Sequence, residues 1–152
     1  MTKKVLTLSI IYKEPHILLG MKKKGFGAGR WNGFGGKVEQ GEAIQDAAKR
    51  EIFESTGIHT HDLHEVGLID FEFQNNPEIL EVHIFRVQGW SGEPIETDET
   101  RPKWFHKNEI PFGEMWPDDV YWLPLLLEGK KFRGKVLFAD MERIIDYKID
   151  LV

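Results

Sequence analysis

The sequence predicts an α+β fold in which a mixed β-sheet is sandwiched between two helices. Short segments with alternating apolar and polar residues recur along the chain, as is typical of half-buried strands. Two longer segments, residues 44–57 and 117–127, carry the apolar spacing and terminal residues of helices. With 152 residues, of which 41% are hydrophobic, the chain can bury one sizeable core, so we expect residues 1–152 to form a single domain.

The first strands are predicted on both sides of a short turn. Residues 5–12 and 17–21 flank Glu14-Pro15-His16, an arrangement that favours a β-hairpin. After the hairpin, residues 25–36 are rich in glycine, and we expect a loop there whose slim backbone allows close approach to a ligand.

The first predicted helix carries acidic residues on its apolar side. Helical spacing produces an apolar stripe that consists of Ile44, Ala47, Ala48 and Ile52. Glu51 and Ser55 fall inside this stripe, where a solvated helix would place no carboxylate. The opposite, solvent-facing side holds Asp46, Lys49 and Arg50. Gly57 supplies the residue that ends the helix.

The inward-facing carboxylate of Glu51 has two explanations. Burying a carboxylate costs free energy unless it is paired with a cation. In the first explanation, Glu51 forms an internal ion pair with Arg50 or a lysine. In the second, Glu51 and Glu54, one turn apart, converge on a divalent cation.

The second half of the chain is predicted to contain strands around one helix. Ile69, Phe71 and Phe73 share one face of a strand at 67–73, which pairs with a strand at 81–87 across the Asn75-Asn76-Pro77 turn. The remaining predicted elements are a short strand at 103–105, a helix at 117–127, and extended segments at 132–139 and 143–151.

One spacing of glycine and acidic residues indicates a particular chemistry. It runs Gly36, five residues, Glu42, seven residues, Arg50-Glu51-Ile52, one residue, Glu54, two residues, Gly57-Ile58. This pattern resembles the Nudix box, the motif of enzymes that hydrolyse nucleoside diphosphates linked to a further group. The family has a second glutamate where this chain has Ser55, so the chain lacks one acidic ligand.

The resemblance extends from Leu18 through Tyr147. Besides the box, the stretches that carry it are LLGMKK at 18–23, GFGAGRWNGFGGKV at 25–38, DETRPKWF at 98–105 and MWPDDVYWLPLLL at 115–127. In these stretches the chain is similar to the animal oxidised-purine nucleoside triphosphatases, relatives of the bacterial MutT enzyme. The resemblance implies a pyrophosphohydrolase that converts 8-oxo-dGTP and 2-hydroxy-dATP to the monophosphate and pyrophosphate. Such an enzyme sanitises the nucleotide pool and so avoids DNA damage.

The same resemblance implies roles for particular residues. Mg²⁺, or Mn²⁺ in its place, would be held by the Gly36 carbonyl and the carboxylates of Glu51, Glu54 and Glu99. Glu51 or Glu99 would act as the general base, and the sequence does not choose between them. Arg50 would orient a neighbouring carboxylate. The base pocket and its surroundings would be formed by Thr7, Lys22, Asn32, Phe71, Phe73, Trp116, Asp118 and Asp119.

Asp118 and Asp119 offer a physical basis for recognising an oxidised base. Oxidation at position 8 of guanine turns N7 from an acceptor into an N–H donor, which a carboxylate can accept. If both aspartates face the pocket, repulsion and burial raise one pKa, which leaves one donor and one acceptor. Their plainer role is that of charges at a helix start, and the aromatic residues of the pocket could equally be core.

Composition argues against several functional classes. The net charge of −5 is unfavourable for a broad nucleic-acid-binding face. The chain has no cysteine, which excludes disulfides, a thiol nucleophile and a cysteine-based zinc site. No segment resembles a secretory leader or a membrane span. We therefore expect a cytoplasmic monomer that acts on a small nucleotide, without nucleic acid or membrane as a partner.

Other motifs in the sequence provide weaker evidence for a function. Residues 25–29 are not followed by a helix of dinucleotide-binding type, and Gly36-Lys37 lacks the hydroxyl residue of a Walker loop. The residues His59, His61 and His64 are expected in a polar loop with no fourth zinc ligand. For residues 22–24, three consecutive lysines, phosphate contact and a solubilising hairpin end both remain open.

Two alternatives to the oxidised-purine activity remain. Because the Ser55 hydroxyl is neutral and a weaker ligand than a carboxylate, the chain could be a catalytically weakened nucleotide-binding Nudix module. It could also be a Nudix hydrolase of another nucleoside diphosphate-linked substrate, such as a dinucleoside polyphosphate or a nucleotide sugar. The Trp-Pro-Asp-Asp segment argues against the latter.

Overall fold

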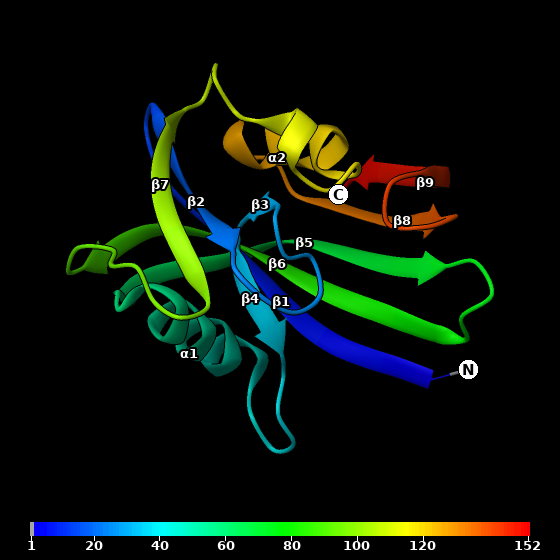
Figure 1. Ribbon diagram of the computed structural model, residues 1–152, viewed down its shortest axis with the longest axis horizontal. Coiled ribbons are helices and arrows are strands. Elements are labelled where there is room, and N and C mark those ends of the chain that lie inside the picture. Colours follow the sequence, from blue (N-terminus) through cyan, green and yellow to red (C-terminus); the bar gives the residue numbers. More distant parts are fainter. Residues whose placement is uncertain (1) are drawn as a thin grey trace.

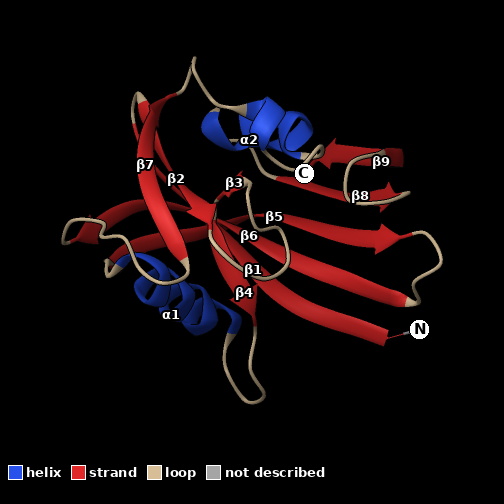
Figure 2. Cartoon of the chain, viewed as in Figure 1, coloured by secondary structure: helices blue, strands red, loops and turns tan. Residues whose placement is uncertain are grey.

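A mixed β-sheet lies between α1 (Ile44–Thr56) and α2 (Asp119–Leu127), as Figures 1 and 2 show. The structure is a computed structural model that describes residues 2–152; Met1, the first residue of the predicted domain, lies outside the described residues. The strands are β1 (Thr2–Lys13), β2 (His16–Lys22), β3 (Trp31–Asn32), β4 (Phe34–Lys37), β5 (His59–Phe73), β6 (Glu78–Ser91), β7 (Thr100–His106), β8 (Phe132–Phe138) and β9 (Ile144–Leu151).

Within residues 2–152 the nine strands form one sheet in the order β3-β2-β1-β6-β5-β8-β9, with β4 paired to β1 and β7 paired to β2. The pairs β1–β6 and β5–β8 are parallel, and the other pairs are antiparallel. The predicted α+β fold with a mixed sheet is therefore confirmed. No helix in this described range is long and apolar enough to cross a membrane.

The two faces of the sheet bury different cores because successive side chains on a strand point to opposite faces. On β1, for example, Ile10 joins the core that includes Trp122 and Leu123 of α2, whereas Ile11 joins the core that includes Ala48 and Ile52 of α1. All six side chains are at most 1% exposed. The sheet thus separates the two helices and fixes each one to its own face.

The predicted hairpin and the predicted first helix are confirmed. β1 and β2 pair with Ile11 opposite Leu18 and Lys13 opposite His16. Helix α1 ends at Gly57, which has a φ of 78° in the left-handed region and donates its N–H to the Phe53 carbonyl. The predicted pairing of the strands around 67–73 and 81–87 is also confirmed, although β5 and β6 are longer than expected.

The prediction of a loop throughout residues 25–36 was wrong. Part of this glycine-rich segment forms β3 and β4, and Gly35 of β4 lies opposite Leu8 of β1. A Cβ atom at Gly35 would lie 1.8 Å from the Thr7 carbonyl oxygen, so the glycine permits close approach of two strands. At Gly35 the missing side chain allows a close approach, as predicted, but the group that approaches is the backbone of β1.

The prediction that the three histidines lie in a polar loop was also wrong. His59, His61 and His64 belong to the first part of β5, where His59 lies opposite Ser91 of β6. These side chains are exposed, and the ladder with β6 supplies the backbone hydrogen bonds that keep the polar segment extended. The strand predicted at 103–105 is longer too, because β7 pairs with β2 along its whole length.

Candidate active site

A cavity of about 420 Å³ lies where β1 and β4 meet the segment after β2, the end of β7 that begins at Thr100, and the start of α2. The residues predicted from the sequence line it except Arg50 and Glu54: Thr7, Lys22, Asn32, Gly36, Glu51, Phe71, Phe73, Glu99, Trp116, Asp118 and Asp119. Residues from distant parts of the chain therefore line one cavity. We call the part of the cavity at α1 the acidic end and the part at α2 the apolar end.

The acidic end is built by Gly36, Glu51, Ser55 and Glu99. A Cβ atom at Gly36 would lie 2.5 Å from Oε1 of Glu51, so a larger residue there would displace this carboxylate from the β4 backbone. The Glu51 side chain is 14% exposed, and Ser55, one turn further along the same face, is buried. Glu99 is exposed and immediately precedes β7.

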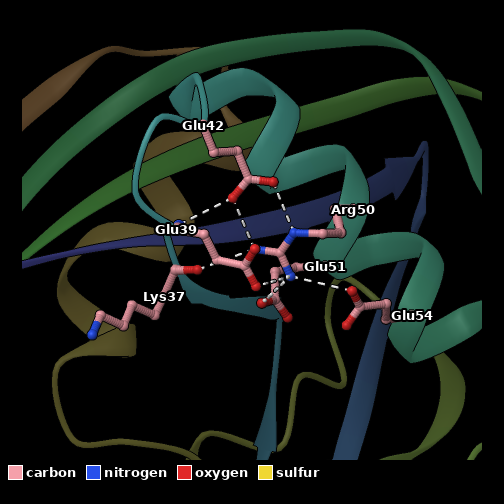
Figure 3. Close-up of polar contacts among 6 residues, drawn as sticks. All are labelled: Lys37, Glu39, Glu42, Arg50, Glu51 and Glu54. Carbon is pink, nitrogen blue, oxygen red and sulfur yellow. Dashed lines mark hydrogen bonds and ion pairs between the residues drawn. The ribbon is translucent and has the colours of Figure 1, made fainter.

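Arg50 connects the carboxylates around this end, as Figure 3 shows. Its Nη1 atom lies 3.0 Å from Oε1 of Glu51 and 3.2 Å from Oε1 of Glu54, and its Nε atom lies 2.8 Å from Oε2 of Glu42. Its Nη2 atom also donates to the Lys37 carbonyl oxygen, at 3.1 Å. Arg50 therefore contacts three carboxylates at once.

The placement of Arg50 on the solvent-facing side of the helix was wrong. Asp46 and Lys49 are exposed, but the Arg50 side chain is only 25% exposed because it turns toward Glu42 and the acidic end. Helical periodicity locates the Cα atom and cannot report where a long side chain reaches. Glu51 thus forms the internal ion pair with Arg50 and also contributes to the cavity wall.

The environment of Glu51 disfavours its charged form. Burial raises the pKa of Glu51, the hydrogen bond from Arg50 opposes this, and the charges of Glu54 and Glu99 raise the pKa further. Among residues 2–152, no three histidine or acidic side chains are gathered closely enough to hold one metal ion. Glu54 is turned to Arg50 and Glu99 lines the cavity, so the predicted ligands surround Glu51 without sharing one point.

The donor set at the acidic end fits a hard divalent cation. Carboxylate and carbonyl oxygens are the ligands that Mg²⁺ and Mn²⁺ prefer. Glycine at position 36 keeps the backbone against the Glu51 carboxylate, and burial together with the charges of Glu54 and Glu99 raises the pKa of Glu51. A cation there would stabilise the charged form of Glu51. Gly36, Glu51 and Glu99 are the residues best placed to hold it, with Glu54 nearby.

The apolar end contains two buried acids at the start of α2. Asp118 is 3% exposed and Asp119 is 2% exposed, and both line the cavity. Trp122 donates its indole N–H to Oδ2 of Asp118 at 2.7 Å, whereas Oδ2 of Asp119 has no hydrogen-bond partner in the described chain. The two neighbouring acids therefore have different surroundings.

Burial and proximity raise the pKa values of the two aspartates to different degrees. Burial raises the pKa of Asp119 well above its ordinary value, and both repulsion from Asp118 and a hydrogen bond with it add to the effect. Burial also raises the pKa of Asp118, but the Trp122 hydrogen bond opposes this, and so does the positive charge of Arg30. We assign the proton to Asp119 because its charged form has the least support.

The sequence analysis did not identify three features that lie in the cavity wall or directly beside it. Phe26, which is 56% exposed, lies against Trp116 with ring centroids 5.1 Å apart, and the Arg30 guanidinium lies 4.4 Å from the Trp116 ring centroid. Apolar side chains of β1 and β6 complete the wall: Leu6, Leu8, Leu80 and Val82. The period of two along β1 places Leu6 and Leu8 on the same face as Ile10, so this pattern could have identified them as neighbours of each other.

For the three consecutive lysines, both phosphate contact and a solvent-exposed role were left open. Lys22 and Lys24 line the cavity, which supports phosphate contact. Lys23 pairs with Glu96 at the surface and donates its backbone N–H to the Glu99 carbonyl at 2.9 Å. Two lysine side chains of the cavity wall are therefore available to a bound phosphate.

The acidic end derives from the segment that resembles the Nudix box, and comparison with known families agrees. The NUDIX domain model matches residues 3–126, so the chain belongs to the Nudix family. The oxidized purine nucleoside triphosphate hydrolase of Mus musculus is 51% identical over 148 residues, which cover 97% of this chain and 95% of the relative. The protein of the same name from Danio rerio is 50% identical over 151 residues, which cover 99% and 97%.

A solved structure agrees with the fold. The crystal structure of the mutator MutT protein from Bacillus halodurans superposes with a TM-score of 0.87 over 97% of each chain, at 24% identity. At this identity the likeness concerns the fold alone. The predicted Nudix membership and Nudix fold are thus confirmed.

Proposed function

We propose that this protein is a Mg²⁺-dependent Nudix pyrophosphohydrolase that converts oxidised purine nucleoside triphosphates to the monophosphate and pyrophosphate. The observation that carries the proposal is the buried Asp118–Asp119 pair, which lines the same cavity as Glu51 and Glu99. One cavity thereby combines polar groups for a base with an acidic end for metal-bound phosphates. The two animal relatives, which match nearly their full length, bear the name of this activity.

Recognition of the oxidised base follows from the hydrogen-bonding groups at the apolar end. A protonated Asp119 offers a donor and an ionised Asp118 an acceptor, so the pair can bind a purine edge that presents one of each. The N7–H of 8-oxo-guanine is a donor that guanine lacks. Asn32 accepts the Gly33 N–H with Oδ1 at 2.8 Å, which leaves its amide hydrogens free to donate to a base. Trp116 and Phe71 supply apolar surface for the purine ring.

Hydrolysis takes place at the acidic end in this proposal. Bound divalent cations would offset the phosphate charge and lower the pKa of the attacking water. Glu51, Glu54, Glu99 and the Gly36 carbonyl would hold them. Glu51 is poised to accept a proton because burial raises its pKa, and Glu99 is the alternative base. Lys22 and Lys24 would bind the polyphosphate.

We propose one catalytic domain over residues 1–152 that acts as a monomer in the cytoplasm, with Mg²⁺ as its metal and Mn²⁺ as a substitute. The net charge of −5 supports a small nucleotide, and not nucleic acid, as the partner. Ser55, neutral at the acidic end, supports the alternative of a catalytically weakened nucleotide-binding module.

A substrate screen tests the proposal. The protein with Mg²⁺ would be offered 8-oxo-dGTP, 2-hydroxy-dATP, dGTP, dATP, a dinucleoside polyphosphate and a nucleotide sugar, with release of pyrophosphate and monophosphate as the readout. We expect turnover of the oxidised purine triphosphates above all others. Faster cleavage of the dinucleoside polyphosphate or nucleotide sugar would contradict the substrate class, and tight nucleotide binding without turnover would establish the binding module.

A further inference from the structure

We propose that Thr97 is a positioning residue that fixes Glu99 relative to the carboxylates of α1. The inference rests on the proposed function, because Glu99 matters only if the acidic end performs hydrolysis. The hydroxyl of Thr97 joins the end of α1 to the turn that carries Glu99, and Thr100 makes a second connection. We call this set of contacts the threonine clamp; it consists of Thr97, Thr100 and the Ser55 carbonyl.

The clamp begins at a helix end. The last carbonyls of an α-helix have no partner within the helix, and Ser55 is next to the last residue of α1. Its carbonyl oxygen accepts a hydrogen bond from Oγ1 of Thr97 at 3.1 Å and another from Oγ1 of Thr100 at 2.8 Å. Both acceptor positions of this oxygen are thus used by the turn that contains Glu99.

The same Thr97 oxygen also shapes the turn itself. It accepts the backbone N–H of Glu99 at 3.2 Å and that of Thr100 at 3.3 Å. A hydroxyl has one donor and two acceptor positions, so each position of Thr97 has a partner. One side-chain atom therefore determines both the conformation of the Glu99 turn and its attachment to α1.

Neighbouring contacts hold the turn from two further sides. Ile95 donates its N–H to the Thr56 carbonyl at 2.9 Å and packs over Gly57, where an added Cβ would lie 3.2 Å from the Ile95 side chain. On the other side, the Glu99 carbonyl accepts the Lys23 N–H at 2.9 Å. The exposed Glu99 side chain therefore stands on a backbone that is fixed to α1 and to the segment after β2.

The clamp affects the chemistry because it sets the position of Glu99 relative to Glu51 and Glu54. Glu51 and Glu54 lie on α1, whereas Glu99 comes from a distant part of the chain, so their relative position depends on what joins the turn to the helix. Groups that orient a metal ligand commonly change metal affinity or activity about 10–100-fold when they are removed. Thr97 itself does not belong to the described cavity wall, which contains Glu99 and Thr100. It acts through Glu99.

Isosteric substitution provides the main test. Thr97→Val keeps the shape of the side chain and removes the hydroxyl, whereas Thr97→Ser keeps the hydroxyl. We expect Thr97→Val to lower kcat about tenfold and to raise the Mg²⁺ concentration for half-maximal rate, with the KM for 8-oxo-dGTP little changed. Thr97→Ser should restore both values. Thr60→Val is the matched control, because Oγ1 of Thr60 is buried and has no hydrogen-bond partner in residues 2–152.

A double-mutant cycle separates positioning from general destabilisation. If Thr97 acts through Glu99, the loss of kcat caused by Thr97→Val should largely disappear in a Glu99→Gln background. Multiplicative losses would overturn the inference, as would equal kcat values for the valine and serine variants. Thr97→Ala repeats the cycle if the valine variant does not fold, with the melting temperature as the check.

Binding of Mn²⁺ without nucleotide, measured by electron paramagnetic resonance, provides a readout that does not need turnover. We expect weaker binding to Thr97→Val than to Thr97→Ser or wild type. Equal Mn²⁺ affinities in all three would overturn the inference even if the enzyme is active. If instead the wild type hydrolyses no oxidised purine while the affinities differ as expected, the proposed function fails and the clamp stands.

Discussion

At the scale of single residues, Asp119 shows how position changes the chemistry of a side chain. On a solvated helix start an aspartate is charged and interacts favourably with the helix dipole. Here burial and the neighbouring Asp118 raise its pKa, and its Oδ2 atom faces no partner within the described chain. A carboxyl group in this state costs stability and becomes useful only when a ligand arrives.

Asp119→Asn should therefore impair recognition of the oxidised base. Asparagine keeps the size of the side chain and a donor, but it cannot exchange a proton with Asp118. We expect kcat/KM for 8-oxo-dGTP to fall about tenfold or more, with Mg²⁺ binding largely unchanged. Steady-state kinetics and Mg²⁺ titration measure the two effects. Asp46→Asn, on the exposed side of α1, is the control; unchanged kcat/KM in Asp119→Asn would leave Asp119 as a helix-start residue only.

Asp119→Asn should also stabilise the nucleotide-free protein at neutral pH. Because the folded-state pKa of Asp119 lies above its ordinary 3.8, the stability of its protonated form is fully present below pH 3.8 and is lost as pH rises through the raised pKa. An amide has no such loss. We expect Asp119→Asn to raise the Tm by about 2–4 °C at pH 7.5, a gain of about 1 kcal/mol, and to give no gain at pH 4. A lower Tm at pH 7.5 would contradict the buried, protonated acid.

Glu51 is the second residue with a sharp prediction. Glu51→Gln keeps the shape and removes the charge and the basic oxygen, so we expect kcat to fall about 10²–10⁴-fold while nucleotide binding persists. Calorimetric titration with a nucleotide measures binding, and pyrophosphate release measures turnover. Near-wild-type kcat at saturating Mg²⁺ would mean that the ion pair with Arg50 is the main role of Glu51, and hydrolysis would then depend on Glu54 and Glu99.

At the scale of elements, the sequence predicted those whose pattern depends on local physics. Helix α1 was predictable because its apolar stripe and Gly57 are local features, and the β1–β2 hairpin because its turn is short. The β4 strand was not, since glycine usually indicates a loop and the need for it arises from β1, which is distant in sequence. The polar start of β5 was missed for the same reason: its partner β6 makes it a strand.

Helix α1 also carries the departure from the family pattern. Ser55 is buried one turn after Glu51 and lines the same cavity, so a carboxylate there would add an acidic ligand. We expect Ser55→Glu to lower the Mg²⁺ concentration for half-maximal rate several-fold and to raise kcat. Mg²⁺ titration of the initial rate checks this. An unchanged metal dependence would mean that position 55 lies outside the metal shell, and rescue of an inactive parent would favour the binding module.

At the scale of the whole molecule, the fold brings an acidic helix face and a buried acid pair to one cavity. The residues near both were predictable because they lie in motifs that resemble a known family, and chemistry restricts those positions. Phe26 and Arg30 also lie in one of these stretches, but their roles were not predicted because they depend on contacts with Trp116, which lies far along the chain. The reach of Arg50 across to Glu42 depends on a side-chain conformation that spacing does not report.

The preference for an oxidised purine over its normal counterpart measures whether the acid pair selects the substrate. With 8-oxo-dGTP and dGTP present together with Mg²⁺, the ratio of the two kcat/KM values follows from the relative rates of their consumption. A pocket that uses Asp118 and Asp119 to read the oxidised edge should prefer 8-oxo-dGTP at least tenfold, which corresponds to about 1.4 kcal/mol or more. A ratio of one would contradict the account, because the acid pair would then play no part in choosing the substrate.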